Sequence, residues 1–362
     1  GKHHKLESGT KYILRYNNST SLMDYQGTTP DMESKFKHNA QVAAAYLSYI
    51  FTAGKWAARA GLRYEFTRMK ASYPDGSNAD YHANLNDWVP SASLQYKISD
   101  SQTLKFSYNT SINRPGIGYL NPAIISTPTA VSFGNANLGS SRNQKLQLVY
   151  MLVTSKFTLQ LSPYYSFTNN GIGRILYEQN RKDVSTYQNV LKSKDFGISS
   201  YTEWTPFTGT SFTLNASMRY ARITLPTPYL KNSGCGGGIY FNWEQKIPWE
   251  LTLTTSIGGE YGNRIYDPYA IEGHWFYYNF TLTRLFFKDK LTVSLSANSP
   301  FIKERSSTYR IVRGDYTVYE RSVRYPQRFG IGLSWNFGKL RASVKKAERS
   351  IQNDDLVGGE KK

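Results

Sequence analysis

Apolar and polar residues alternate along most of this chain. In residues 329–337 the odd positions are Phe329, Ile331, Leu333, Trp335 and Phe337, whereas the positions between them hold Gly, Ser or Asn. Successive side chains of a β-strand point to opposite faces, so this pattern predicts a strand whose two faces meet different surroundings. Six other stretches alternate as clearly, namely residues 56–66, 104–112, 157–167, 212–220, 276–282 and 291–297.

Weaker alternation fills the gaps between these stretches. It covers residues 12–16, 40–50, 92–98, 146–152, 195–204, 239–243 and 251–257. The two sets together predict fourteen strands and no extended helix.

The connections between the predicted strands alternate in length. Short turns are expected at residues 52–55, 99–102, 154–156, 205–209, 246–249 and 287–289. Longer polar loops are expected at residues 17–39, 69–87, 113–143, 169–194, 223–234, 263–272 and 300–325. Short turns on one edge and long loops on the other are typical of an up-and-down, antiparallel β-barrel of an outer membrane.

The composition of the apolar face favours a transmembrane barrel over a soluble sheet. Aromatic residues make up 15% of the chain and charged residues only 19%, below the roughly 25% of soluble domains. Trp56, Trp204 and Trp249 lie near predicted strand ends, as in the aromatic girdles of membrane barrels. A soluble sandwich also alternates, so a secreted soluble β-protein that binds surface polysaccharide remains an alternative.

The sequence carries no pattern of catalytic, cofactor-binding or metal-binding residues. The single cysteine, Cys235, excludes a disulfide framework, and the five His residues do not form an HExxH spacing. GxSxG, Ser-His-Asp and phosphate-loop patterns do not occur either. We therefore expect no enzyme, no cofactor and no metal. The net charge of +18 fits an anionic membrane surface better than nucleic acid, because no nucleic-acid-binding motif accompanies it.

Three charged residues of one predicted strand lie on its polar face. Arg59, Arg63 and Glu65 alternate with the apolar positions of residues 56–66, so they are expected to face the barrel lumen. They could contact a plug or line a path for a solute. Residues of this kind also form salt-bridged ladders inside barrels.

The predicted loop 300–325 combines cations with aromatic rings. Arg305, Arg310, Arg313 and Tyr316 are its candidate contacts with an extracellular ligand or with lipopolysaccharide. Arginine pairs with phosphate, and aromatic rings stack on sugars. The alternative is a loop that is merely solvated.

Several short segments, taken in order, resemble a known family. They are Gly61-Leu62-Arg63-Tyr64-Glu65, Ile112-Asn113-Arg114-Pro115, Leu120-Asn121-Pro122 and Phe133-Gly134-Asn135, followed by the ending 342–356. Across nearly its whole length the chain resembles the C-terminal barrel half of a TonB-dependent outer-membrane receptor, of the outer membrane protein β-barrel family common in Bacteroidetes.

The resemblance implies a bacterial outer-membrane transporter for a bulky solute. It implies that these strands belong to a barrel of about 22 strands. The plug domain and the contact with an energy-coupling protein would lie in residues upstream, and outer-membrane lipid and a surface lipoprotein would be further partners. A self-contained passive channel of fourteen strands is the alternative, since an even strand number permits it.

The resemblance also assigns roles near the C-terminus. Residues 1–337 would form the barrel strands and extracellular loops, and residues 338–362 a polar periplasmic tail. Phe337 ends the last alternating strand, where barrels of this kind carry a terminal aromatic read by the assembly machinery. The other interpretation of Phe337 is one more girdle aromatic.

Overall fold

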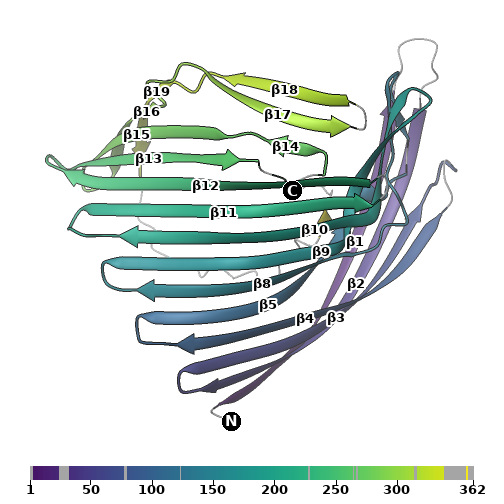
Figure 1. Cartoon of the computed structure of the whole chain (residues 1–362), viewed down its shortest axis with the longest axis horizontal. Coiled ribbons are helices and arrows are strands. Elements are labelled where there is room, and N and C mark those ends of the chain that lie inside the picture. Colours follow the sequence, from purple (N-terminus) through teal and green to yellow (C-terminus); the bar gives the residue numbers. More distant parts are fainter. Residues whose placement is uncertain are drawn as a thin grey trace.

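Fourteen antiparallel strands follow one another across a single curved sheet (Figure 1). The computed structural model describes residues 3–23, 32–76, 80–122, 124–226, 229–263, 265, 268–313, 316–337 and 356–357. The fourteen wall strands are β1 (His4–Met23), β2 (Met32–Ala53), β3 (Trp56–Ser72), β4 (Tyr81–Lys97), β5 (Gln102–Pro115), β8 (Ser141–Val153), β9 (Phe157–Gln179), β10 (Lys182–Trp204), β11 (Thr210–Pro226), β12 (Tyr229–Ile247), β13 (Leu251–Gly262), β15 (Trp275–Phe286), β16 (Leu291–Asn298) and β19 (Arg328–Trp335). They confirm the predicted strands one for one, and the six predicted short turns lie between them.

The prediction of long loops at the opposite edge was partly wrong. β9 and β10 run through the predicted loop 169–194 and leave only Asn180 and Arg181 between them, with φ of 53° and 60°. Positive φ at both residues is the type I′ geometry that joins twisted strands. Outside a bilayer both faces of a strand meet water, so the apolar alternation ends there. The backbone hydrogen bonds between the two strands continue beyond that point.

The predicted loop 300–325 also contains regular structure. Its residues form a hairpin of β17 (Arg305–Arg313) and β18 (Tyr316–Arg324). Together with β14 (Ala270–Glu272), the hairpin makes a separate three-stranded sheet, which extends along one side of the wall (Figure 1).

Strand register assigns the two faces of the wall. Trp56 pairs with Tyr96, and eight residues along β3 Tyr64 pairs with Trp88. The rings of the two pairs are 4.4 and 4.8 Å apart. Eight residues span about 26 Å along a strand, or about 20 Å across a bilayer at the usual tilt. These two aromatic rows therefore border the outward apolar band.

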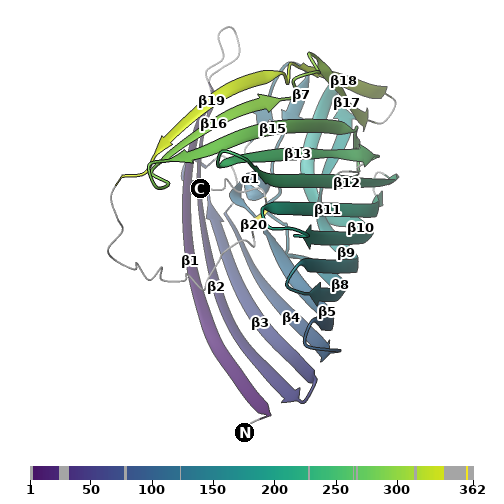
Figure 2. The ribbon, with the colours of Figure 1, turned by 90° about the vertical axis from the view of Figure 1, so that its left-hand side faces the viewer.

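The inner face of the wall is covered by the connection between β5 and β8, called the inner loop here. It comprises residues 116–140, described except for residue 123, and contains α1 (Ile117–Leu120), β6 (Ile125–Ser126) and β7 (Ala130–Ser132). Leu120 and Leu138 of the inner loop are buried against Ala40 and Met69 of the wall. β7 also pairs in parallel with β10. Figure 2 shows α1 inside the curve of the sheet.

The sheet formed by the described residues has two open edges. β1 pairs only with β2, and β19 pairs only with β16. A closed barrel would join its first and last strands, so these fourteen strands form a curved wall and not a closed cylinder. In the same described residues, no helix has the length and apolar character needed to cross a membrane.

Only two residues of the predicted tail 338–362 are described. β20 (Leu356–Val357) pairs in parallel with Arg114 and Pro115 at the end of β5, inside the curve of the sheet (Figure 2). Residues 338–355 and 358–362 lie outside the described part of the chain, so the periplasmic location of the tail stays a prediction.

Candidate functional site: a charged network on the inner face and a pocket beside the hairpin

Two buried carboxylates lie opposite each other on the inner face of the wall. Glu65 of β3 and Asp87 of β4 are register partners, and they are 7% and 3% exposed. An unpaired charge at such a depth would be strongly destabilising. Each carboxylate therefore requires a cation, and each receives one from another strand.

The two cations come from the strands that flank the inner loop. Arg114 of β5 donates to the Glu65 carboxylate, and its Nε donates to Thr67 Oγ1 at 3.0 Å. Arg142 of β8 donates from Nη2 to Asp87 Oδ1 at 3.1 Å. The inner loop is thus anchored to β3 and β4 by one ion pair at each of its ends.

Arg114 and Arg142 occupy positions where strict alternation would place a lipid-facing residue. Arg114 shares its parity with Phe106 on β5, which is exposed on the outer face. Pairing of β4 with β5 stops at Ser91 and Asn109, so the upper part of β5 is free to leave the line of the wall. A charged residue at a lipid-facing parity is a signal in the sequence that the strand departs from the wall there.

Asparagine side chains tie the inner loop to the hairpin of β9 and β10. The Asn189 amide donates to the Gly139 carbonyl at 3.1 Å, and its oxygen accepts the Gly139 N–H at 2.7 Å. The Asn170 amide donates to the Ser140 carbonyl at 2.9 Å, and the Ser140 hydroxyl donates to Asp87 at 2.8 Å. Side-chain amides satisfy backbone groups that no strand partner reaches.

Gly134 is required by the close approach of the chain to itself. A Cβ at this position would collide with the backbone carbonyls of Asn121 and Tyr119. The Gly134 N–H donates to the Asn121 carbonyl at 2.8 Å, and the Asn135 N–H donates to the Tyr119 carbonyl at 2.7 Å. The segments 120–122 and 133–135, both noted in the sequence, thus meet with Tyr119 in one compact turn of the inner loop.

Arg59, Arg63 and Glu65 all lie on the inner face, because their parity on β3 is opposite to that of Trp56 and Tyr64, whose aromatic pairs face outward. Arg63 Nε lies 2.5 Å from Glu65 Oε1, and Arg59 Nη2 lies 3.0 Å from Glu7 Oε2. The two arginines are about half exposed. They form a ladder of ion pairs that continues the buried network toward the short-turn edge.

Tyr73 lies in the connection after β3, beside the inner loop. Its ring packs against Phe36, with 5.2 Å between the ring centres, and the side chain is buried together with Ala71. Burial, followed by the nearby carboxylates Asp80 and Asp75, raises the pKa of the Tyr73 phenol to about 12. The phenol is therefore neutral throughout the physiological range.

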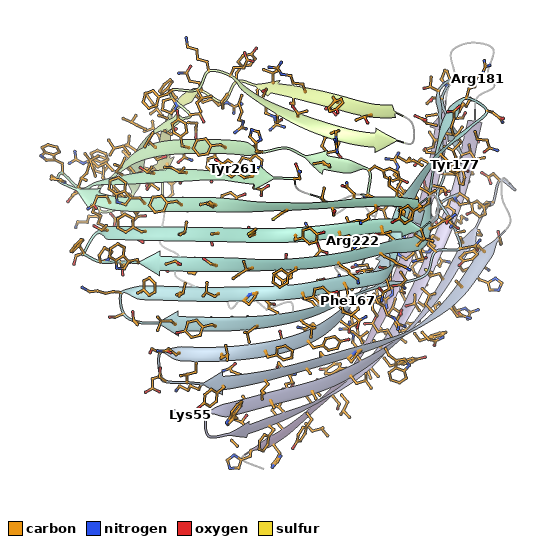
Figure 3. The ribbon with its side chains drawn as sticks, viewed as in Figure 1. Lys55, Phe167, Tyr177, Arg181, Arg222 and Tyr261 are labelled. Atoms are coloured by element: carbon orange, nitrogen blue, oxygen red, sulfur yellow. The ribbon has the colours of Figure 1, made fainter. Side chains whose placement is uncertain are left out.

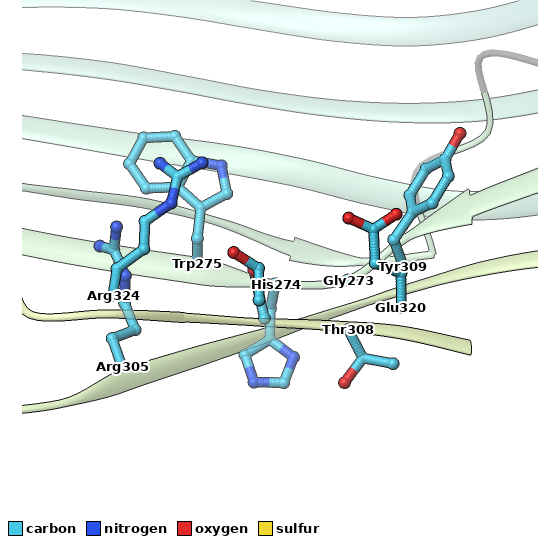
Figure 4. Close-up of a pocket in the computed structure, with 10 residues that line it drawn as sticks. Gly273, His274, Trp275, Arg305, Thr308, Tyr309, Glu320 and Arg324 are labelled. Atoms are coloured by element: carbon cyan, nitrogen blue, oxygen red, sulfur yellow. The ribbon is translucent and has the colours of Figure 1, made fainter. Parts of the chain in front are cut away.

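A second candidate site lies between the β17–β18 hairpin and the start of β15. It is a pocket of about 460 Å³. Its lining side chains include His274 and Trp275, Arg305 and Tyr309 of β17, and Glu320 and Arg324 of β18. Figure 4 shows the two guanidinium groups at the Trp275 end and the Glu320 carboxylate at the Tyr309 end.

The electrostatics of the pocket favour an anionic group. Arg305 and Arg324 are directly opposite each other across the hairpin, and like charges in this arrangement repel. Arg305 donates to the Phe276 carbonyl. This acceptor is neutral, so the contact does not neutralise the positive charge of the Arg305 guanidinium group. An anion between the two guanidinium groups would remove the repulsion through charge-assisted hydrogen bonds.

The structure separates the four residues proposed for the extracellular contact. Arg305 lines the pocket, whereas Arg310 pairs with Ile271 and Tyr319 and has the opposite strand parity. Arg313 and Tyr316 face each other at the tip of the hairpin, but their side chains lie outside the described residues. His274 and Glu320 carry no signal in the sequence that links them to this pocket, because only the fold brings β15 beside the hairpin.

Phe337 lies just beyond the last wall strand. It is 88% exposed, and its ring centre lies 6.3 Å from that of Trp335. Trp335 in turn lies 5.7 Å from Phe287 in the neighbouring short turn. This position fits both a girdle aromatic and an exposed terminal signal.

The remaining chemistry of the described residues is sparse. No group of three His, Cys, Asp or Glu residues there is placed to hold a metal ion. Cys235 is an exposed free thiol on the outward face of β12, opposite Tyr220.

Comparisons with known proteins agree with this geometry. A family model described as "Outer membrane protein beta-barrel family" matches residues 1–335. No curated protein sequence matches the chain. Similar solved structures include the ferric yersiniabactin uptake receptor FyuA from Yersinia pestis, at 15% identity and a TM-score of 0.65, over 93% of this chain and 52% of that chain.

Two further structures give the same result. The siderophore receptor PiuA from Acinetobacter baumannii is 14% identical with a TM-score of 0.61, over 92% of this chain and 53% of that chain. The copper transporter OprC is 12% identical with a TM-score of 0.63, over 92% of this chain and 54% of that chain. The chain thus spans about half the length of each of these structures, and at such identities the similarity concerns the fold.

Proposed function

The chain belongs to the outer membrane protein beta-barrel family, and from this premise we propose that it forms the C-terminal wall of a TonB-dependent receptor, which takes up a bulky solute. Its location is the bacterial outer membrane. The proposal contains no catalytic step. It includes a plug domain and an energy-coupling protein as partners, both contacted through residues outside this chain.

The open edges of the fourteen-stranded wall carry this proposal. β1 and β19 each have one partner strand among the described residues. Further strands between them would close a wider barrel, with room for a plug and a bulky solute. A self-contained passive channel would instead need β1 and β19 to pair with each other.

We further propose that the solute carries anionic or hydroxyl-rich groups. The pocket beside Trp275 combines two opposed guanidinium groups with an aromatic ring, a combination suited to phosphates, carboxylates and sugars. The similar structures include a ferric yersiniabactin uptake receptor, a siderophore receptor and a copper transporter. A metal chelate with anionic groups therefore belongs to the candidate solutes.

The division of the chain at residue 337, the role of Phe337 in assembly and the surface lipoprotein partner remain parts of this proposal. A contact of Arg310, Arg313 and Tyr316 with lipopolysaccharide is a second candidate role for the tip of the hairpin. Their location beyond the membrane strands supports it.

Conductance in a planar bilayer tests the receptor against the channel. The full-length protein that carries this chain is expected to give no steady current, because a plug would occupy the lumen. A steady current from correctly folded protein would favour the passive channel. Loss of growth on one limiting solute, both in a strain without the receptor and in a strain without the energy-coupling protein, would identify the solute.

The pocket is tested separately with paired charge variants. Arg305→Gln/Arg324→Gln should weaken binding of a phosphorylated oligosaccharide probe at least tenfold. Arg321→Gln is the matched control, because Arg321 is exposed and lies on the other face of the same hairpin. Equal affinities of the pocket variant and the control would refute the pocket without refuting the receptor.

A further inference from the structure

A cluster of cations lies on the outer face of the wall near its long-loop edge. Lys194 of β10 and Arg222 of β11 are register partners. Next to them, Lys192 pairs with Thr224, which pairs on its other side with Lys231 of β12. All four cations are exposed, and none of them forms an ion pair with a described carboxylate.

The orientation of this cluster follows from the residues between its members. Ala221 and Ile223 alternate with Arg222 and are 2% and 4% exposed, because they pack against Ile265 on the inner side. Arg222 therefore points outward, toward the lipid. Figure 3 shows Arg222 nearer the long-loop edge and Lys55 at the short-turn edge.

An aromatic pair, Phe196 and Tyr220, and an apolar groove lie below the cations on the same face. Phe196 and Tyr220 pair two residues further down β10 and β11. Beneath them, a groove of about 480 Å³ is lined by Ile198, Ala216, Met218, Cys235, Ile239 and Tyr261. Small side chains such as Ala216 keep its floor low, while Met218 and Ile239, 58% and 54% exposed, project beside it.

The spacing of these features matches an amphipathic lipid. Arg222 is four residues from Met218, about 13 Å along the strand. From this juxtaposition we propose that the outer surface of β10–β12 binds a phosphorylated, multiply acylated lipid of the lipid A class. The cations would bind its phosphates, and one acyl chain would occupy the groove.

A second copy of this chain fits the surface less well. In a two-fold dimer the same patch meets itself, so the four cations of each copy would approach those of the other and repel. A lipid phosphate neutralises the cations instead, while the aromatic pair lies at the interface between headgroup and acyl chains. The inference requires only the membrane location of the wall and not the proposed uptake.

The same arrangement recurs on β2–β4. Lys37, Arg68 and Lys70 are exposed on the outer face. Below them lies a groove of about 650 Å³ whose lining includes Leu47, Tyr64 and Trp88. The wall should therefore retain two such lipids.

Native mass spectrometry of the full-length protein with added diphosphoryl lipid A tests the proposal. The wild type should retain two lipids. Lys192→Gln/Lys194→Gln/Arg222→Gln/Lys231→Gln should retain one, with at least tenfold weaker binding at the altered site. The control Lys288→Gln/Lys290→Gln removes charge from the short-turn edge and should retain two. Ala216→Phe keeps every cation but fills the groove, so it should lower occupancy severalfold.

Each alternative has its own outcome. Dephosphorylated lipid A should bind at least tenfold more weakly, and equal binding of phosphatidylglycerol would overturn the assignment to lipid A. Two retained lipids in the variant with four substitutions would overturn the site on β10–β12. Loss of a protein dimer instead of a lipid would identify a second copy of this chain as the occupant. Heat-modifiable migration confirms folding of each variant. If the variant with four substitutions fails this check, Arg222→Gln alone replaces it.

Discussion

Breaking the buried ion pair between Glu65 and Arg114 should release the inner loop from the wall. Glu65→Met keeps the approximate length of the side chain but leaves the Arg114 guanidinium buried without its carboxylate. Arg114 lies immediately before the inner loop, and both side chains are less than a tenth exposed. The predicted consequence is local opening of residues 116–140, with the fourteen strands still formed.

The expected loss of local stability follows from the burial of the ion pair. Removing one partner of a buried pair costs about 3–5 kcal/mol, and the remaining bond of Arg114 to Thr67 at 3.0 Å favours the lower end of that range. A loss of about 3 kcal/mol corresponds to a roughly hundredfold rise in the open population. Glu65→Met/Arg114→Met removes both charges and should recover most of the loss, because apolar replacement of a buried pair is often neutral.

Amide hydrogen exchange reports this opening directly. The N–H groups of Gly134 and Asn135 form hydrogen bonds within the inner loop, so their exchange measures its local stability. In Glu65→Met they should exchange about a hundredfold faster. The control is Glu7→Gln, which breaks the half-exposed pair with Arg59 at 3.0 Å and should cost less than about 1 kcal/mol.

Two results would contradict this reasoning. One is unchanged exchange in Glu65→Met relative to Glu7→Gln, which would mean that the ion pair does not hold the loop. The other is a double variant no more protected than Glu65→Met, which would mean that the buried unpaired charge is not the cause of the opening.

Three further predictions concern residues outside the wall strands. Leu138→Ala should destabilise the inner loop by about 2–5 kcal/mol, because Leu138 is 1% exposed; exchange of the same amides measures this, and the exposed Asn137→Ala should leave them unchanged. The difference in phenolate absorbance between wild type and Tyr73→Phe should have its midpoint near pH 12. The stabilisation from the buried neutral phenol should be complete below about pH 10 and lost as the pH rises toward 12. A midpoint of the absorbance difference near pH 10 would instead mean that the Tyr73 ring is exposed. Phe337→Ala should lower the amount of heat-modifiable protein in the outer membrane more than Phe329→Ala, which removes a ring 70% exposed on the last strand, and equal losses would mean that Phe337 is only a girdle aromatic.

The strands and short turns were predictable because two solvents act on the two faces of each strand. Lipid selects apolar side chains at every second position and the lumen accepts polar ones, so a local pattern is sufficient. Residues 56–66 carry this pattern, and the structure has β3 there with Trp56 and Tyr64 on the outer face. The alternation ends where the strand leaves the bilayer, which explains why residues 169–194 were wrongly predicted as a loop.

The candidate site was only partly predictable from the sequence. Parity alone placed Arg59, Arg63 and Glu65 on the inner face. The partner of Glu65 is 49 residues away, and no local signal links the two. The lipid-facing parity of Arg114 is the one local sign that this residue must leave the wall. Similarly, the sequence grouped Arg305 with Arg310 by composition, although the hairpin places them on opposite faces.

By itself, the sequence determined the order of the fourteen wall strands, the two faces of each strand and the class of membrane in which the wall lies, because these depend on contacts between each residue and its solvent. Only the tertiary structure decided which charges meet, how the inner loop packs on the wall and which cations gather above an apolar groove. Those features depend on register and curvature over distant strands, and register is a property of paired chains that a single strand's pattern does not contain.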